Sequence, residues 1–285
     1  MKGELSMRFV LPVLLGVVMN LLSCTSSQAA GCDFGPFQEL LRDCLQVGGR
    51  VDGIVCNLFD YSQVARPETR QAALLKRQLE TLATCSPSSL HGREEEIAFW
   101  INVYNFDVIW QVVQQWPLES AKEMQDVRTA GKKLLRVADR LYSLKEIKSD
   151  ILLGRLQEPL ALFVLADGAI SGPDLAGEIY RASPPRNRFS AMMIDPAQLG
   201  QRLRVQARLF LENPGKGLRI DRARETVFFS QLFTRYPQLF PAGARSALPL
   251  VIDILHDSRG ADYLQHNVFR IQYLDYNWKL NSLNK

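Results

Sequence analysis

The stretch that decides the fold is EEEIAFWINVYNFDVIWQVVQQW, residues 94–116. Its three leading glutamates suit the positive end of a helix dipole. Apolar side chains then recur at helical spacing, at Ile97, Ile101, Tyr104, Val108 and Val112. Trp100, Phe106 and Trp110 widen this apolar surface. We therefore predict one long helix at the centre of the hydrophobic core.

Segments on both sides of this helix change between helical and strand patterns. We expect helices over 67–85, from Ser143 towards Leu153 behind a Ser-x-x-Glu capping box, over 197–212, around Leu232 and over 248–255. We expect a hairpin around Asp139, a fully buried strand over 160–166, and strands over 226–229 and 268–273. The mixture predicts an α+β fold, a mainly helical single domain with a small, mostly antiparallel sheet.

Composition excludes several classes of protein. The chain has 285 residues, 47% hydrophobic and 22% charged, which argues against a disordered, collagen-like or polytopic membrane protein. A net charge of +4 is too small to predict nucleic acid as a partner. Residues 181–224, however, hold ten Lys or Arg against three Asp or Glu. Solvated helix and loop faces explain such a run, and attraction to an anionic membrane surface is the alternative.

The first 30 residues resemble an export signal. Lys2 and Arg8 precede the apolar run 9–22, which is too short and too interrupted for a membrane-spanning helix. The run ends in Leu21-Leu22-Ser23-Cys24, which resembles the lipobox of bacterial lipoproteins and predicts lipidation of Cys24. Cleavage after Ser27-Gln28-Ala29, an uncleaved anchor and a start at Met7 are the alternatives. We expect a signal peptide over 1–23, a cysteine-containing helical lead-in over 24–50 and one domain over 51–285.

The cysteines fit an oxidising compartment. Four remain once Cys24 is set aside, and they are separated by 12, 12 and 29 residues without a C-x-x-C pair, so a zinc or redox site is disfavoured. We predict two disulfides among Cys32, Cys44, Cys56 and Cys85, with the pairing open, and buried free thiols as the alternative. A bridge would clamp a helix containing Phe37, Leu40 and Leu41 onto the domain.

Several segments, in order, resemble the domain of unknown function 547 (DUF547) family of bacterial exported proteins and plants. They are Val51-Asp52-Gly53, Phe59-Asp60-Tyr61, Ala98-Phe99-Trp100-Ile101-Asn102-Val103-Tyr104-Asn105, Ser143-Leu144-Lys145-Glu146-Ile147, Ala161-Leu162-Phe163-Val164-Leu165, Gly168-Ala169-Ile170-Ser171-Gly172-Pro173 and Tyr276-Asn277-Trp278-Lys279-Leu280-Asn281. The resemblance covers residues 51–285. Its most specific part is the segment from Phe99 to Asn105.

The departures from the family pattern bear on catalysis. The resemblance implies a Glu-His pair at the positions of Lys148 and Ser149, a histidine at Leu162 and cysteines at Asp167 and Gly172. A thiolate beside a histidine would be a natural nucleophile, and this chain lacks those groups. We therefore lean towards a protein that is not an enzyme, a pseudoenzyme of the family.

The remaining candidates for a site are Asn102, Asn105, Asp167, Ser171 and Asp174. The two asparagines share a face of the central helix and must be hydrogen-bonded, either to the neighbouring backbone or to a ligand. The other three follow the predicted buried strand, where turn chemistry competes with a weak cation site. None of the histidines, His91, His256 and His266, has a spacing that defines a catalytic dyad.

Together these features predict an exported, envelope-associated binding or interaction module without cofactor or metal, and with no nucleic-acid partner. The alternative is a hydrolase or transferase with a pocket near the Trp100–Asn105 helix. A histidine or carboxylate within hydrogen-bond reach of Ser171, Asn102 or Asn105 would favour the enzyme.

Overall fold

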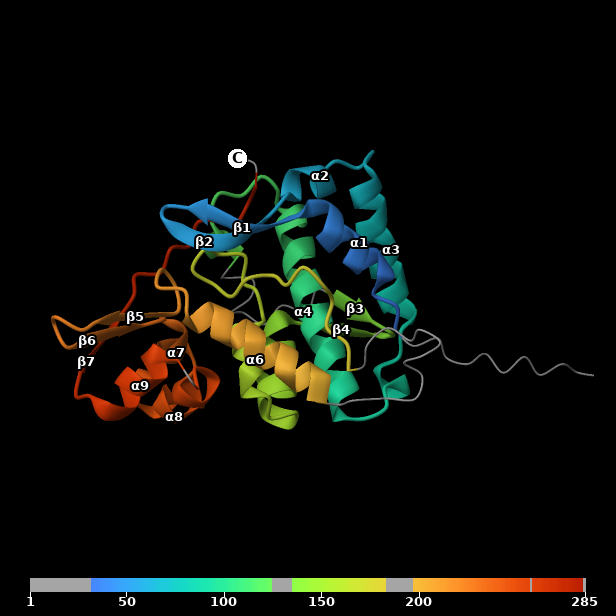
Figure 1. The fold of residues 1–285 in the computed structure, drawn as a ribbon. Helices are drawn as coiled ribbons and strands as arrows, with labels where there is room; N and C mark the ends of the chain where they lie inside the picture. The colour runs from blue at the N-terminus through green and yellow to red at the C-terminus, as the bar shows by residue number, and fades with distance from the viewer. Residues whose placement is uncertain (1–31, 125–134, 183–196, 257, 284–285) are drawn as a thin grey trace, which may run out of the picture. The chain divides into compact units, whose positions relative to one another are not determined.

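A computed structural model describes residues 32–124, 135–182, 197–256 and 258–283. The predicted signal peptide and Cys24 lie outside these residues. All described residues belong to one compact unit. Its central element is helix α4, Arg93–Gln114 (Figure 1). Every side chain from Ile97 to Ile109 is buried, which is typical of a helix surrounded by other elements.

Three helices near the N-terminus pack beside α4. Helix α1, Gly35–Cys44, lies against α3, Arg70–Thr84, and the short α2, Tyr61–Ala65, contacts both α3 and α4. The α3 helix begins three residues after Pro67, because Thr69 accepts a hydrogen bond from the amide of Ala72 and caps it. A single 3-10 turn, η1, Pro87–Ser89, leads into α4.

Two antiparallel hairpins flank these helices. Strands β1, Leu45–Val51, and β2, Ile54–Phe59, pair with Val51 opposite Ile54. Strands β3, Leu135–Val137, and β4, Arg140–Tyr142, form the predicted hairpin around Asp139. Ser143 then caps the next helix through the amide of Glu146, which confirms the predicted capping position. That helix is π-helical over η3, Glu146–Arg155.

The prediction of a buried strand over 160–166 is wrong. The residues are buried, but Pro159–Phe163 form a 3-10 helix, η4, with Glu158 accepting from the amide of Leu160. An apolar run of this length fits a buried helical turn as well as a strand, and here Pro159 occupies the first helical position. The chain then turns at Gly168, whose φ is +80°.

The C-terminal part packs against η4 through helix α6, Ala197–Leu211. Strands β5, Leu218–Asp221, β6, Thr226–Phe229, and β7, Arg270–Tyr273, form a sheet in the order β5-β6-β7, antiparallel and then parallel. Between β6 and β7 lie α7, Leu232–Arg235, α8, Ala244–Ile254, and α9, Arg259–His266. A short 3-10 turn, η2, Ala121–Met124, follows α4.

These elements confirm the predicted α+β class with helices dominant. The strands of the described residues lie in three small sheets, mostly antiparallel. In the same part of the chain, no helix is both long and apolar enough to cross a membrane.

One of the two predicted disulfides is present. Cys32 and Cys85 are bonded, with Cα atoms 5.3 Å apart, so the bridge ties the segment before α1 to the end of α3. The prediction of a second bridge is wrong, because Cys44 and Cys56 are buried free thiols. Cys44 belongs to the main core, whereas Cys56 packs in a separate cluster with Leu58 and Ile170. The two thiols therefore serve as small apolar side chains.

Candidate functional site

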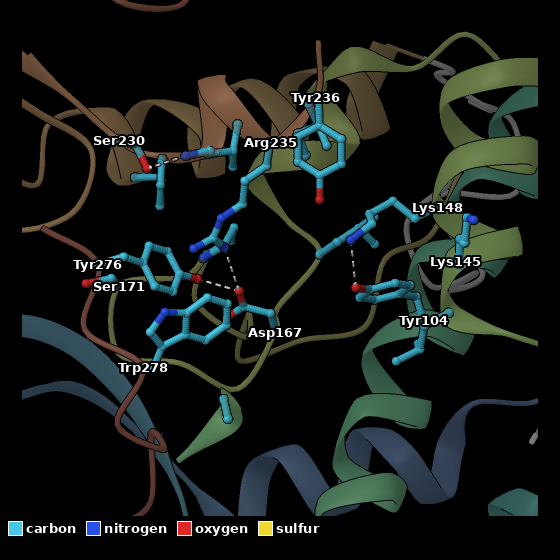
Figure 2. Close-up of a pocket in the computed structure, with 17 residues that line it drawn as sticks. Tyr104, Lys145, Lys148, Asp167, Ser171, Ser230, Arg235, Tyr236, Tyr276 and Trp278 are labelled. Carbon is cyan, nitrogen blue, oxygen red and sulfur yellow. Dashed lines mark hydrogen bonds and ion pairs between the residues drawn. The ribbon is translucent and has the colours of Figure 1, made fainter. Parts of the chain in front are cut away.

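One cavity gathers residues from across the described sequence. It has a volume of about 430 Å³ and lies between α4, η3, η4, α6 and the segment around α7 (Figure 2). Its polar lining consists of Tyr104, Lys145, Lys148, Asp167, Ser171, Ser230, Arg235, Tyr236, Tyr276 and the indole of Trp278. Its apolar lining consists of Ala121, Leu144, Leu162, Leu165, Pro173, Phe210 and Leu232. We call it the central pocket.

The C-terminal segment closes one side of the central pocket. Residues 278–281 run past the turn at Gly168, where the amide of Ile170 donates to Lys279 O and the amide of Asn281 donates to Gly168 O. The amide of Ala121 donates to Trp278 O on the other side of this segment. These bonds place the rings of Tyr276 and Trp278 at the wall of the pocket, 4.6 Å apart.

Asp167 and Arg235 form one end of the pocket. Asp167 Oδ1 accepts from the amide of Ala169, and Oδ2 accepts from the hydroxyl of Tyr276 and lies 3.8 Å from the Arg235 guanidinium. That guanidinium is stacked 3.7 Å over the Tyr276 ring and 4.5 Å from that of Trp278. Burial, and then the charge of Asp167, raise the pKa of Tyr276 well above its ordinary value. Tyr276 therefore stays protonated and donates its hydrogen.

Lys148 forms the other end (Figure 2). Its Nζ lies 3.4 Å from the hydroxyl of Tyr104, and it sits 5.6 and 5.3 Å from the ring centres of Tyr104 and Tyr236. Burial lowers the pKa of this ammonium, but the oxygens of Tyr104 and Tyr236 outweigh burial, and the pKa is raised. Among the described residues, no carboxylate lies within ion-pair distance of Lys148. The pocket thus holds a charged lysine whose neighbours are phenols.

The two asparagines of α4 bind backbone and do not face the central pocket. Asn102 donates to Tyr180 O and accepts from the Tyr180 amide, both at 2.8 Å. Asn105 donates to Val164 O and accepts from the amide of Ala166. Both are buried, so these paired bonds fix the segments 164–166 and 180 to the central helix. Of the two predicted roles, the structure shows the structural one.

The turn residues also have structural partners. Ser171 lines the pocket, but its Oγ accepts from the amide of Asn277. Asp174 lies away from the pocket lining and pairs with the buried Lys216, Oδ2 to Nζ 2.7 Å, while Oδ1 accepts from the amide of Asn57. In the part of the chain that is described, no three His, Cys, Asp or Glu side chains gather as metal ligands. Of the predicted candidates, the pocket brings together Asp167 and Ser171 alone.

Three of the positions where the family resemblance implies other residues line the pocket, namely Lys148, Leu162 and Asp167. A fourth, Gly172, adjoins it, and a Cβ added there would overlap Asp167 Oδ1. Any side chain at 172 would therefore displace the Asp167 carboxylate from its present position. None of the three histidines is among the lining residues.

Sequence reasoning missed the residues that give the pocket its charge and aromatic character. Tyr104, Tyr276 and Trp278 lie within the family-like segments, which could have drawn attention to them. Lys148 was considered only as a departure from the family pattern. Arg235 and Tyr236 had no motif at all, and only the fold brings them beside α4 and η3.

Several basic side chains of the region 181–224 already have partners within the protein. In its described part, Arg204 pairs with Asp253, Arg208 with Glu212 and Lys216 with Asp174. Arg202 stacks on Tyr180 and donates to Ile179 O. An anionic membrane surface as the partner of this region stays a prediction.

Comparison with known proteins finds one family that resembles part of the chain. Residues 87–211 match the model of the family described as protein of unknown function, DUF547, which supports the resemblance that the sequence motifs predict. The matched region contains α4, η3, η4 and α6, and with them Lys148, Leu162 and Asp167. Arg235, Tyr236, Tyr276 and Trp278 lie beyond it. No curated protein and no solved structure matches the chain.

Proposed function

We propose that this DUF547-like protein is an exported binding protein of the bacterial envelope, whose central pocket takes a small anion without transforming it. The observation that carries the proposal is Lys148. Its ammonium lines the cavity beside the phenols of Tyr104 and Tyr236, and no carboxylate of the described residues lies at ion-pair distance, so its positive charge is open to an anion in the cavity. A bound anion would complete this site.

The surroundings of the polar groups argue against catalysis. A lysine with a raised pKa keeps its proton, so Lys148 is unsuited to act as a nucleophile or base. The Ser171 hydroxyl accepts from the backbone of Asn277, and both asparagines of α4 bind backbone. Asp167 is engaged by Tyr276 and Arg235. These contacts support a role in binding.

Two observations support export. The residues before Cys24 have the basic start and apolar run of a signal peptide. The Cys32–Cys85 bridge is the kind of bond that persists in an oxidising compartment. Lipidation of Cys24 would hold the protein at a membrane, and Cys24→Ala should then release it from the membrane fraction or block its processing. Recovery of a soluble wild-type chain beginning at Ala30 would contradict the lipid anchor.

The binding proposal is tested with 8-anilinonaphthalene-1-sulfonate, an anion with an apolar body and a fluorescence that rises in dry pockets. We expect one saturable site on the wild-type protein and at least tenfold weaker binding by Lys148→Met. The matched control is Lys76→Met, which makes the same change on the exposed face of α3. Equal binding by all three proteins, or no saturable binding, would overturn the proposal.

A further inference from the structure

The central pocket has an excess of positive charge, and this excess limits the charge of the anion that the pocket can bind. Arg235 has a carboxylate in Asp167, and Lys145 is an exposed residue at the edge. Lys148, which is half-buried, is the lining cation that remains once these are accounted for. The interior therefore has one positive charge to be compensated, which matches a ligand with a single negative charge.

The Asp167 end is unsuited to a second negative group. Both oxygens of Asp167 are already hydrogen-bonded, and one face of the Arg235 guanidinium is covered by Tyr276. An anion placed there would meet the Asp167 carboxylate, and like charges at short range repel strongly where water is excluded. A ligand with anionic groups at both ends would thus be disfavoured.

The Lys148 end offers a small set of donors. An ammonium has three hydrogens, and the Tyr104 and Tyr236 hydroxyls both lie within its hydrogen-bonding reach, which leaves a hydrogen for an anion. The hydroxyls of Tyr104 and Tyr236 can themselves donate to an anion beside the ammonium. In Figure 2 the hydroxyl of Tyr236 points towards Lys148, as does that of Tyr104. A planar group with two oxygens fits this arrangement, whereas a dianionic phosphate would bring one charge more than Lys148 can compensate.

The rest of the wall is apolar. Leu162 and Leu165 come from η4 and the residues after it, Phe210 from α6 and Leu232 from α7. These side chains give the ligand an apolar surface to contact, and hydrocarbon removed from water contributes roughly 25 cal/mol per Å². The ligand therefore has an apolar body attached to its charged head.

We infer that the central pocket binds a monocarboxylic acid with an apolar body, its carboxylate against Lys148 between Tyr104 and Tyr236. This inference rests on the proposed anion-binding function and names the ligand class. The carboxylate accepts from the ammonium and the phenol hydroxyls, and the hydrocarbon covers the leucine and phenylalanine wall. The Asp167–Arg235 pair limits the ligand to one charge.

The test is displacement of the bound naphthalene sulfonate by a matched series of eight-carbon compounds, namely octanoate, octyl phosphate, octanedioate and octanol. At pH 7.5 we expect octanoate to displace the dye at concentrations at least tenfold lower than each of the other three. In Lys148→Met, octanoate should lose its advantage over octanol, and Lys76→Met should keep it.

A second variant tests the other end of the pocket. Asp167→Asn removes the carboxylate that opposes a second anion, so octanedioate should gain at least threefold relative to octanoate. The measurement on Asp167→Asn still tests the inference if the Lys148→Met variant does not fold.

The outcomes separate the two proposals. If the dye shows no site that depends on Lys148, the anion-binding function itself fails. If the dye binds there but octyl phosphate or octanedioate displaces it as well as octanoate does, the monocarboxylate inference is overturned and anion binding stands. An octanedioate affinity unchanged in Asp167→Asn would also contradict the inference.

Discussion

Two lysines of this chain, the buried Lys216 and the half-buried Lys148, have opposite surroundings. Lys216 follows α6, and its Nζ lies 2.7 Å from Asp174 with a side chain that is 1% exposed. Lys148 on η3 faces the phenols of Tyr104 and Tyr236 across a cavity, with no carboxylate at ion-pair distance among the described residues. The fold supplies a carboxylate to the fully buried Lys216, whereas the half-buried Lys148 faces the cavity.

This difference distinguishes a lysine with a structural role from a lysine at a candidate binding site. Asp174 also accepts from the amide of Asn57, so the Lys216 pair joins β2, the turn after Gly172 and the end of α6. Such a pair is complete without any ligand. Lys148 lines a cavity of about 430 Å³, where an anion can reach it. A partly buried charge thus indicates a binding site when its partner is missing and a cavity adjoins it.

The largest effect on stability is expected from breaking the Lys216 pair. Asp174→Asn leaves a buried ammonium without its carboxylate and should lower the free energy of unfolding by about 3–5 kcal/mol. Chemical denaturation measures the change. The double variant Asp174→Asn with Lys216→Met should recover part of the loss, because the unpaired charge is gone. A loss below about 1 kcal/mol would show that Lys216 is not held by this pair.

The next largest effect is expected at Asn105. Asn105→Leu leaves the carbonyl of Val164 and the amide of Ala166 buried without partners, at about 1–3 kcal/mol for each group. We expect a loss of roughly 3 kcal/mol in the free energy of unfolding. Gln114→Leu, on the exposed end of α4, is the control and should change stability by less than about 0.5 kcal/mol. Equal effects of the two changes would refute the structural role of Asn105.

The sequence predicted the parts of this fold whose signal is local. The helical period of residues 94–116, the Ser143 cap and the hairpin around Asp139 all depend on neighbouring residues, and all are present. The segment 160–166 was mistaken for a strand because a short apolar run has no decisive period. The prediction of a second disulfide was wrong because an even number of cysteines gives no information about the distances between them. Cys44 and Cys56 belong to different hydrophobic clusters.

The site was predicted only in part, for a related reason. Asp167 and Ser171 lie in the pocket, yet their role could not be judged without knowing that Arg235, Tyr276 and Asn277 meet them. Those contacts join residues more than 60 positions apart in the sequence. Lys148 was visible only as a departure from the family pattern, because the absence of a counter-ion is a property of the fold.

A smaller effect on stability is expected from Lys148→Met. The variant loses a hydrogen bond and two cation–π contacts, worth about 0.5–2 kcal/mol, and it also avoids the cost of burying an ammonium. The free energy of unfolding should therefore change by less than about 1 kcal/mol, in contrast to Asp174→Asn. A loss comparable to that of Asp174→Asn would mean that Lys148 serves the fold and not a ligand.

The smallest effect near neutral pH is expected at a buried group that carries no charge, Cys44. Burial, and then the nearby Asp60 and Asp43, raise the pKa of this thiol from 9.0 to about 12. An acid with a higher pKa in the folded chain contributes stability below its unfolded pKa. That contribution is therefore full below about pH 9 and is lost as the pH rises towards 12. At pH 8 a thiol reagent should label Cys44 only after denaturation, and rapid labelling of the folded protein, read by peptide mass, would contradict its burial.

The most direct test of the account is a crystal structure of the full chain with 8-bromooctanoate, whose bromine is located by anomalous scattering. The account predicts a carboxylate oxygen about 3 Å from Lys148 Nζ and the bromine against the apolar wall that includes Leu162 and Phe210. A ligand bound elsewhere, a carboxylate at Arg235 with Lys148 unoccupied, or an empty pocket at saturating ligand would contradict the claim that Lys148 marks the binding site.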